Sequence, residues 1–580
     1  MKKLFNNKYI VAFIMAFISY LSFLIYFKDI FSNDSFNLMY TLLFFFLYYF
    51  YYVELGRSKN KLGKIEKNSI ILVSFILSFC LVVGSIVSSY LGDIAGTIFN
   101  FHNILYCFVG IVGYMLFFYF VIRKFVSLTN KLKIKGKGNF GGKDFFKFVL
   151  LFLLAWLPYF LRYFPAVMTP DSYYSIENVS NFILSDYHTF GHTWFFGAFF
   201  LLGKLLFGNL NLAVGFYIVI QMIINAIVFT FVVRFLYVKN VNKILKWVII
   251  LFMLLSPLYA IYSVTLWRDI LFGCSFILLM LSLYDYVDNN YKLSKFNVSM
   301  YLVATLIILF FRNNGIYVFI LLVPCLVLFS KYNKKILAIS NIIIIVLYFV
   351  IKGPVFDYFS IAKSTSSEAY SIPLQQISRV VVSGLEIDAK DYKYLNTVID
   401  MKKISKEYSP TISDPVKRLV DNKNLNKSKS KFFKVWFKLF LRHPRTYIEA
   451  YLCQTLGYWY PDVVYWASGG ESKSIFKDIN VYSEPVIHDT NNLFGAITSR
   501  KLPLSNLIWS LGTMFILLMF SMFLVFYRKN YRYLLCYMPL VCLWFTLMVA
   551  TPVFCELRYV YGLFVCMPLM VVIPFVKKNV

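Results

Sequence analysis

Long apolar stretches recur along most of this chain, and each is close to the length of a membrane-spanning helix. A helix needs about 20 apolar residues to cross a hydrocarbon core of roughly 30 Å. The pattern therefore predicts an all-α polytopic membrane protein with about fourteen spans. They lie near residues 9–27, 36–54, 69–90, 100–122, 147–164, 213–237, 246–264, 270–287, 297–311, 315–331, 335–352, 504–527, 533–551 and 558–576.

Two segments depart from this pattern. Within a first large loop at 164–212, Trp194–Phe207 is apolar but short and carries Lys204. We interpret it as an interfacial or re-entrant helix, because counting it as a span would place the basic residues after 238 outside. Residues 353–503 are polar and long enough for a small core. The predicted organisation is N-terminal transmembrane helices with basic cytoplasmic loops (1–146), a catalytic transmembrane core (147–352), a mainly helical extracytoplasmic domain (353–503) and C-terminal transmembrane helices (504–580).

The charge of the loops alternates along the chain and gives an orientation. Segment 55–68 holds five basic residues against one acid, and segment 122–147 holds eight against one. The intervening loops 28–35 and 91–99 hold a single base, Lys28. Cytoplasmic loops carry the excess of Lys and Arg, so the chain is predicted to be a multi-pass cell-membrane protein with both termini in the cytoplasm. The net charge of +30 therefore reports topology, and nucleic acid is not a predicted partner.

The composition excludes a soluble globular protein, since 59% of the residues are hydrophobic and 20% aromatic. Seven of the nine cysteines fall in predicted spans. Cys453 and Cys555 are expected to face outward and could pair, and no CxxC spacing points to metal or redox chemistry. The high content of Lys, Asn, Ile and Phe is typical of an AT-rich bacterial genome.

Unusual polar residues gather at the predicted outer ends of the spans. Thr169-Pro-Asp-Ser172 follows a span and holds the lone acid Asp171 by turn chemistry. Charged groups at such a boundary are partly desolvated, so each needs a partner or a ligand. Arginines suit phosphate oxygens, and carboxylates can take a proton or hold a divalent cation such as Mg²⁺ or Mn²⁺. The other residues of this set are His188, His192, Arg268, Asp269, Arg312, Asn313, Glu556, Arg558 and Tyr559.

Each of these residues also has a structural interpretation. Arginine and aspartate at a boundary often pair and anchor a helix end, and a lone histidine in a loop is more often structural. His188 and His192, spaced i and i+4, could bind a metal on one helical face, but they lack an HExxH context. The middles of the spans carry almost no charge, which argues against an ion-coupled transporter. A lipid-linked glycan flippase or exporter and a non-catalytic envelope-assembly protein remain the alternatives to an enzyme.

At these residues the chain resembles the type C superfamily of membrane glycosyltransferases, which use polyprenyl-phosphate sugar donors. The resemblance rests on Asp171 directly after a span, interfacial helices behind it, the second acid in Trp267-Arg-Asp269, and an outer domain late in the chain. More narrowly, the chain is similar to an uncharacterised family of bacterial polytopic envelope proteins over roughly Phe148 to Phe575. That pattern appears here as Thr169-Pro-Asp-Ser172, His188 through His192, Arg312-Asn-Asn-Gly315, Ile372-Pro-Leu-Gln-Gln-Ile-Ser-Arg379, Gly457-Tyr-Trp-Tyr-Pro461 and Glu556-Leu-Arg-Tyr559.

The resemblance implies sugar transfer from a polyprenyl-phosphate donor to an envelope glycan, lipid or protein acceptor on the outer face of the membrane. Asp171 would act as the base or orient the acceptor hydroxyl, and Asp269 would help to bind a metal or the donor phosphate. The implied substrate-binding residues are His188, His192, Arg268, Arg312, Asn313, Gln375, Arg379, Tyr458, Glu556, Arg558 and Tyr559. Protein mannosyltransferases have two adjacent acids in the first loop, whereas Asp171 is followed by Ser172. This difference leaves the metal requirement and the acceptor class open.

Overall fold

A computed structural model of the chain describes residues 7–27, 37–57, 62–130, 132, 134, 138–332, 334–465, 479, 481–488 and 509–576. The termini and loop 28–35, on which part of the predicted orientation rests, lie outside these residues, as does most of 466–508. The described residues form helices joined by turns and a few isolated bridges, and they contain no strand. The predicted all-α fold is therefore confirmed for this part of the chain.

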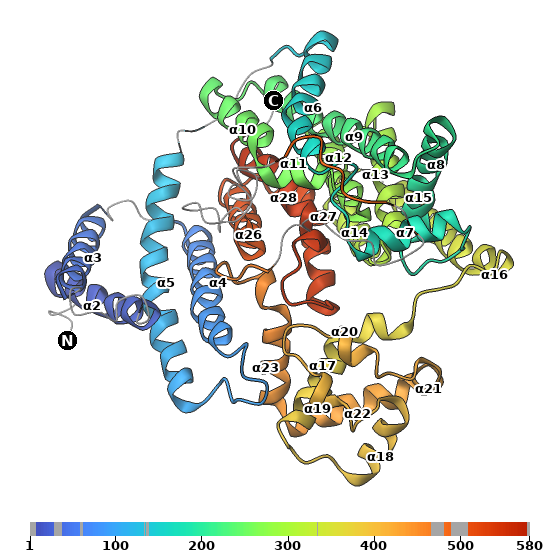
Figure 1. Cartoon of the computed structure of the whole chain (residues 1–580). Helices are drawn as coiled ribbons and strands as arrows, with labels where there is room; N and C mark the ends of the chain where they lie inside the picture. Colours follow the sequence, from blue (N-terminus) through green and yellow to red (C-terminus); the bar gives the residue numbers. More distant parts are fainter. Residues whose placement is uncertain are drawn as a thin grey trace. The chain divides into compact units, whose positions relative to one another are not determined.

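The helices group into two compact units. The first comprises Met1–Leu132, Ser366–Val463 and Ala550–Cys555. Within it, α2 and α4 pack against α5, and α17 packs against α23. The helices of this unit are α2 (Lys8–Phe27), α3 (Asn37–Arg57), α4 (Lys64–Ser89), α5 (Phe101–Thr129), η3 (Ser366–Tyr370), α17 (Ser371–Val382), α18 (Ala389–Val398), α19 (Ile404–Glu407), α20 (Asp414–Lys417), α21 (Asn422–Lys427), α22 (Lys429–Arg442), α23 (Pro444–Thr455) and η4 (Leu456–Tyr458) (Figure 1).

The second unit comprises Lys133–Thr365, Val464–Val549 and Glu556–Val580. Its helices are α6 (Gly142–Arg162), α7 (Pro170–Ser180), α8 (Phe190–Phe207), α9 (Leu210–Val238), α10 (Lys243–Leu255), α11 (Pro257–Ser263), α12 (Arg268–Asp288), α13 (Lys295–Phe311), α14 (Gly315–Phe329), α15 (Lys334–Val350), η2 (Ile351–Val355), α16 (Phe356–Tyr358), α26 (Leu511–Tyr527), η5 (Tyr531–Tyr533), α27 (Leu534–Val549), η6 (Leu557–Val560), α28 (Tyr561–Val565), α29 (Met567–Val572) and η7 (Ile573–Phe575). Helix α12 is central, because 94% of its most apolar window is buried, and it packs against α9, α13, α27 and α28.

Nine helices in the described part of the chain are long and apolar enough to cross a membrane, or up to eleven if two bent pairs each count as one span. Each of the fourteen predicted spans contains a described helix. However, α13, α14 and α26 are shorter than a standard span. Helix α8 begins at Phe190 rather than Trp194 and is one of the nine. Multiple candidate spans are therefore present, and the count of fourteen stays a prediction.

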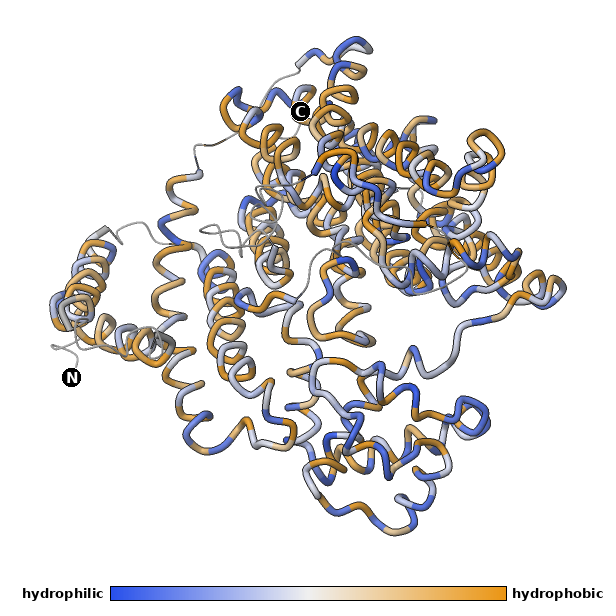
Figure 2. Tube along the Cα trace, viewed as in Figure 1, coloured by the Kyte–Doolittle hydropathy of each residue, from blue (hydrophilic) through white to orange (hydrophobic). Residues whose placement is uncertain are grey.

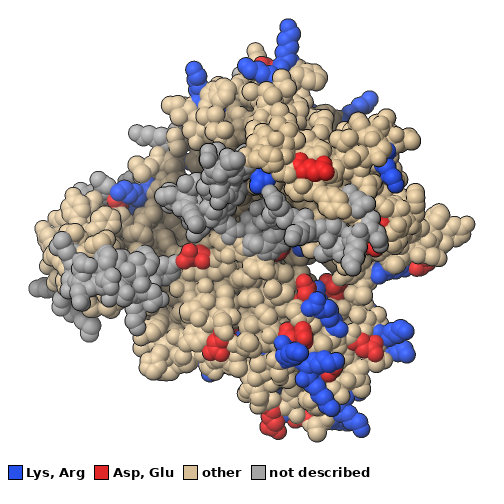
Figure 3. All heavy atoms as spheres, viewed as in Figure 1, with Lys and Arg blue, Asp and Glu red and all other residues tan. Residues whose placement is uncertain are grey.

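The predicted insert at 353–503 contains a helical segment with its own apolar core. Helices α17 to α23 bury Leu374, Ile377, Phe432, Leu439 and Tyr447, together with smaller apolar residues around them. Hydrophilic residues are frequent along this segment, whereas the long helices of both units are mostly hydrophobic (Figure 2). In the space-filling view, charged side chains gather over the same segment (Figure 3). Helices α17 to α23 are therefore more polar than the long helices, and an extracytoplasmic location for this segment stays a prediction.

The turn between α13 and α14 depends on a close backbone approach at Gly315. A Cβ atom at this position would collide with the carbonyl oxygen of Ile308, a backbone atom that cannot rotate away. We therefore expect Gly315→Ala to lower the free energy of unfolding by about 1–3 kcal/mol, measured by denaturant titration in detergent. Gly142→Ala is the matched control, since a Cβ there meets nothing within 4 Å. Equal stability of the two variants would contradict the close approach.

Candidate functional site

Asp171 lies in the first turn of a helix rather than on a loop. Thr169 is the N-cap of α7, and Pro170 occupies its first helical position. A threonine cap followed by proline is a helix-start signal, so the residues that we interpreted as a fixed loop instead begin α7. An acid in the first turn is also favoured by the positive end of the helix dipole.

Hydrogen bonds join the segment before α7 to the segment before α12. The backbone N–H of Val167 donates to the carbonyl of Val264 at 3.0 Å, and that of Leu266 donates to the carbonyl of Val167 at 3.1 Å. Ser172 Oγ donates to the carbonyl of Leu266 at 2.7 Å. Trp267 Nε1 donates to Thr169 Oγ1 at 2.5 Å. These bonds hold the starts of α7 and α12 together, and with them Asp171 and Arg268.

The Asp171 carboxylate has three polar neighbours. Arg558 Nη1 lies 2.5 Å from Oδ2, Arg268 Nη2 lies 3.9 Å from Oδ2, and His188 Nδ1 lies 3.9 Å from Oδ1. Burial opposes ionisation, but the charges of Arg558 and Arg268 outweigh it and hold the pKa of Asp171 well below its usual range. The side chain is still 30% exposed. Asp171 is therefore an ionised carboxylate that a small group can reach.

A second ion pair joins the start of α12 to the end of α13. Arg312 Nη1 lies 2.5 Å from Asp269 Oδ1, and the Asp269 side chain is 1% exposed. Asp269 Oδ2 is buried and has no hydrogen-bond partner in the described part of the chain. The Arg312 guanidinium lies 4.5 Å from the centre of the Tyr559 ring. Tyr559 thus lies next to both arginines, since the Arg558 guanidinium is 5.2 Å from the same ring.

Together these side chains form one group that we call the arginine–carboxylate cluster. Arg558 Nε also lies 3.3 Å from Glu556 Oε1, and its guanidinium lies 5.2 Å from the Trp267 ring. Three arginines and three carboxylates balance each other in formal charge, and most have a partner within the cluster. The exception is Arg268, whose closest carboxylate is 3.9 Å away and whose buried Nε has no hydrogen-bond partner among the described residues. The cluster consists of Asp171, Arg268, Asp269, Arg312, Glu556 and Arg558.

The two histidines do not share a helical face, so the geometry under which they could bind one metal is not formed. Between them, Thr189 has a φ of 59°, and α8 begins only after it. His188 lies before the helix and stacks on Tyr174 with ring centres 4.9 Å apart. His192 lies inside α8, with Nε2 3.2 Å from the Tyr217 hydroxyl. His188 is therefore beside Asp171, and His192 is part of a buried polar chain.

That buried chain contains a residue that our sequence analysis missed, Gln221. The Tyr217 hydroxyl donates to Gln221 Oε1 at 3.2 Å. Gln221 Nε2 donates to the carbonyls of Ser263 and Thr265 at 2.9 and 2.8 Å, just before α12 begins. Gln221 therefore holds the backbone that positions Arg268. A polar residue in the apolar run 213–237 was the available signal, because such residues within spans usually have a buried partner.

Asn313 lies outside the cluster and contacts the segment that carries His188. Its Nδ2 donates to the carbonyl of Asp186 at 3.1 Å, and its Oδ1 accepts from Lys352 Nζ at 3.2 Å. Lys352 Nζ also lies 2.5 Å from Asp186 Oδ1. These contacts fix the segment that leads to His188. A substrate-binding role for Asn313 stays a prediction.

Three of the predicted substrate-binding residues belong to the first compact unit. Gln375 Nε2 donates to the carbonyl of Ser409 at 2.6 Å and to Gln454 Oε1 at 2.9 Å. Arg379 is fully buried and donates to the carbonyl of Gly96 at 2.7 Å. The Tyr458 hydroxyl donates to the carbonyl of Val553 at 3.0 Å. All these contacts lie within the unit and stabilise it, and a role in substrate binding stays a prediction.

The described residues offer no group of three or more His, Cys, Asp or Glu side chains that could hold a metal ion. The nearest charged neighbours of Asp171 and Asp269 are arginines, which repel cations. The surroundings of Asp171 and Asp269 are therefore unsuited to binding a divalent cation. Cys453 and Cys555 are both buried, and no disulfide joins them in the described part of the chain, so the pairing that the sequence left open is not formed there.

His188 gives the stability of the protein a pH dependence. Burial and the charge of Arg268 lower the pKa of His188 from 6.5 to about 4. An unfolded chain therefore takes up this proton first as the pH falls, and the stabilisation present above pH 6.5 is lost between pH 6.5 and pH 4. We expect the free energy of unfolding to fall by about 2 kcal/mol between pH 7 and pH 5. Thermal unfolding in detergent at the two pH values measures it.

Two histidine variants serve to isolate this effect. His188→Asn should remove the part of the loss that His188 contributes, whereas the buried His192 keeps its own contribution. His102→Asn is the matched control, because His102 is exposed, and it should leave the loss unchanged. A loss of the same size in the His188 variant would show that another group causes it.

Comparison with known proteins identifies the family to which the chain belongs. Residues 146–579 match a protein family described as "Family of unknown function (DUF6020)". No curated protein and no solved structure matches the chain significantly. The matched region includes the whole arginine–carboxylate cluster and covers well over half of the chain. The chain therefore belongs to this family of unknown function.

Proposed function

We propose that this protein transfers a sugar from a polyprenyl-phosphate donor to a cell-envelope acceptor at the outer face of the cell membrane. The observation that carries the proposal is Asp171, an ionised and partly exposed carboxylate beside Arg558 and Arg268. It lies shortly after α6, one of the nine candidate membrane spans. A lipid-borne phosphate and a polar acceptor meet at the end of a span.

In the proposed reaction, the oxygen of an acceptor hydroxyl attacks the anomeric carbon of the donor sugar. A new glycosidic bond forms as the bond from that carbon to the phosphate oxygen breaks. The hydroxyl proton passes to Asp171, and polyprenyl phosphate leaves with the bonding electron pair. Because its pKa is low, Asp171 is a weak base that takes the proton late. Before that transfer it also orients the acceptor hydroxyl by accepting its hydrogen bond.

Arg268 is the arginine that we assign to the donor phosphate. The Arg268 side chain is 20% exposed, and its guanidinium makes no close ion pair among the described residues. By contrast, Arg558 and Arg312 each lie 2.5 Å from a carboxylate oxygen. A fixed guanidinium near the leaving oxygen stabilises the negative charge that develops there. The paired arginines then position the two acids rather than bind the donor.

The proposed topology has fourteen spans, with the cluster and the 353–503 domain outside. The contacts of α8 support leaving it out of the count. His192 contacts Tyr217, and Gly203 packs closely against Ala213, so both ends of α8 meet the first turns of α9. Beyond Gln221, α9 runs along α12 to its last turn, where Lys239 Nζ lies 2.7 Å from Asp288. Helix α8 therefore lies beyond the Arg268 end of α12.

Cysteine labelling tests this topology. In a cysteine-depleted chain, an impermeant reagent added outside should modify a cysteine at Lys423 and spare one at Lys64. If both positions react alike, α8 is an additional span. If only Lys64 reacts, the whole orientation is inverted.

The function itself is tested first in cells. A deletion strain should lack one sugar linkage of the envelope glycans that the wild type has, and the intact gene should restore it. A gene with Asp171→Asn should fail to restore it although the protein is inserted. Identical glycans in the deletion strain and the wild type would reject the proposal.

A further inference from the structure

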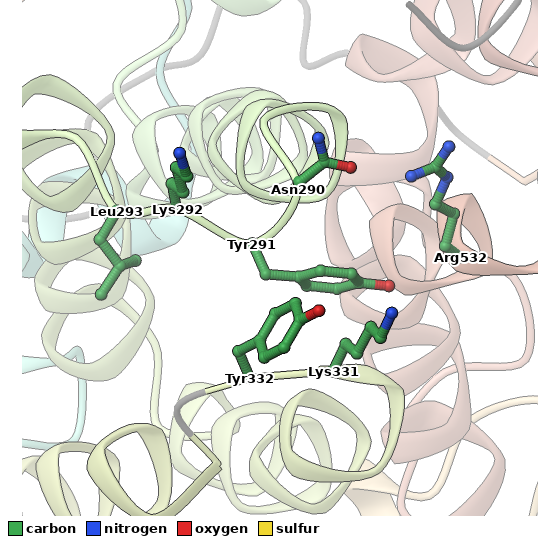
Figure 4. Close-up of a pocket in the computed structure, with 7 residues that line it drawn as sticks. All are labelled: Asn290, Tyr291, Lys292, Leu293, Lys331, Tyr332 and Arg532. Carbon is green, nitrogen blue, oxygen red and sulfur yellow. The ribbon is translucent and has the colours of Figure 1, made fainter. Parts of the chain in front are cut away.

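A second polar site lies at the opposite end of α12 from the arginine–carboxylate cluster. Helix α12 has 21 residues from Arg268 to Asp288, which corresponds to about 32 Å and to the thickness of a bilayer core. At the Asp288 end, three connecting segments surround a cavity of about 1130 Å³. Its lining residues are Asn290, Tyr291, Lys292, Leu293, Lys331, Tyr332 and Arg532 (Figure 4).

The cavity carries positive charge that no described residue neutralises through an ion pair. Lys292, Lys331 and Arg532 come from three different segments, and the lining contains no acid. None of the three has an ion-pair partner within the described ranges. The acid nearest in sequence, Asp288, is already engaged, because it accepts from Lys239 Nζ and from the Tyr533 hydroxyl, both at 2.7 Å. The cavity is therefore suited to an anion.

The cavity also has hydrogen-bond donors and a fixed shape. Figure 4 shows the side chains of Tyr291, Tyr332 and Lys331 pointing into the space between the segments, with Arg532 facing it from the segment before α27. Asn290 and Tyr291 have φ values of 55° and 63°, a backbone conformation that persists only where its surroundings hold it. Tyr291 is only 9% exposed. Phenol hydroxyls and cations together match the oxygens of a phosphate group.

Apolar surface next to the cavity indicates that the phosphate belongs to a lipid. The turn that carries Lys331 joins α14 and α15, and these helices expose Leu328 and Ile336 by 74% and 61%. Leu293, in the lining itself, is 49% exposed. Acyl chains would cover these side chains while the headgroup lies in the cavity. The positive-inside rule accounts for basic residues at this end, but it does not require three of them to meet around a cavity without an acid.

We propose that this cavity binds the phosphate-bearing headgroup of an anionic membrane lipid. Basic pockets between membrane helices on the cytoplasmic side are the recurrent sites for such headgroups. The proposal is independent of the proposed glycosyl transfer, because it rests on the other end of α12. If so, anionic lipid should stabilise the protein against unfolding, and zwitterionic lipid should not.

Thermal unfolding of the full chain in nanodiscs tests this assignment. Replacing pure phosphatidylcholine with a mixture containing phosphatidylglycerol should raise the Tm by about 5 °C. Lys331→Gln combined with Arg532→Gln should remove this shift. The matched control combines Lys243→Gln with Lys295→Gln, which removes two exposed positive charges outside the lining and should keep the shift. If the double variant cannot be purified, each single substitution should remove about half of the shift.

Three results would overturn the proposal. The first is the absence of any shift in the wild-type protein, and the second is an equal shift in the cavity variant. The third concerns the source of the phosphate and uses detergent-solubilised protein without lipid. There, inorganic phosphate at about 10 mM should leave the Tm unchanged relative to chloride at equal ionic strength. If inorganic phosphate alone produced the full shift, the ligand would be a soluble anion and not a lipid.

Discussion

Asp171→Asn is expected to lower the rate of sugar transfer at least about 100-fold, the lower end for the loss of a positioned general base. Asparagine keeps the shape of the side chain but cannot take up the acceptor's proton. The substitution also replaces the charged partner of Arg558, which lies 2.5 Å from Asp171, so we expect unfolding to become easier by about 2 kcal/mol. Single-turnover transfer with purified protein in nanodiscs measures the first effect and thermal unfolding the second.

The control for this prediction is an acid on the same helix. Glu177→Gln removes a partly exposed carboxylate of α7 that makes no described ion pair, and we expect transfer to stay within about twofold of wild type. If both variants retain near-normal turnover, Asp171 only anchors the start of α7. If Asp171→Asn instead prevents folding, its contact with Arg558 is structural.

Arg312→Leu should produce the largest loss of stability, about 3–5 kcal/mol, because it leaves the buried Asp269 carboxylate without a counter-charge. Asp269 is 1% exposed, and Arg312 is its charged neighbour at 2.5 Å. No water reaches the carboxylate to compensate for the lost guanidinium. Denaturant unfolding in detergent, together with the yield of monodisperse protein, measures the loss.

The double variant Asp269→Leu with Arg312→Leu distinguishes the contribution of the ion pair to stability from the contribution of side-chain packing. Replacing both partners of a buried pair with apolar residues is often close to neutral, so the double variant should recover most of the stability lost in Arg312→Leu. Its sugar-transfer activity should stay low if Asp269 takes part in the reaction. A double variant as unstable as the single one would show that the two residues are not coupled.

The membrane helices and the site acids were accessible from the sequence because local rules determine them. Apolar runs of spanning length became helices, whereas Thr169-Pro170, which we interpreted as part of a fixed loop, is a helix-start signal and begins α7. Charged residues at the ends of spans must find partners, and this requirement singled out Asp171, Arg268 and Arg558 before any contact was known. The pairing of Asp269 with Arg312 could not be read in the same way, because it depends on how α12 packs against α13.

Other predictions failed or stayed open because they needed tertiary information. The i and i+4 spacing of the two histidines assumed one continuous helix, but Thr189 adopts a φ of 59° between them. Gln375, Arg379 and Tyr458 were grouped with the site by motif, and motif spacing does not determine which compact unit a segment joins. They fold with the first unit, whereas Asp171 belongs to the second. Gln221 was a visible polar residue in an apolar run, but its partners, the Tyr217 hydroxyl and two backbone carbonyls, are set by tertiary packing and could not be read from the sequence.

The most direct test of the central claim supplies purified protein in vesicles with a labelled polyprenyl-phosphate sugar and an envelope extract as acceptor. We predict that the wild-type protein forms a glycosidic product and releases polyprenyl phosphate. The Asp171→Asn variant should bind the donor but form at least about 100-fold less product. Movement of the labelled donor across the bilayer without any glycosidic product, equally in both proteins, would contradict the account and identify a flippase.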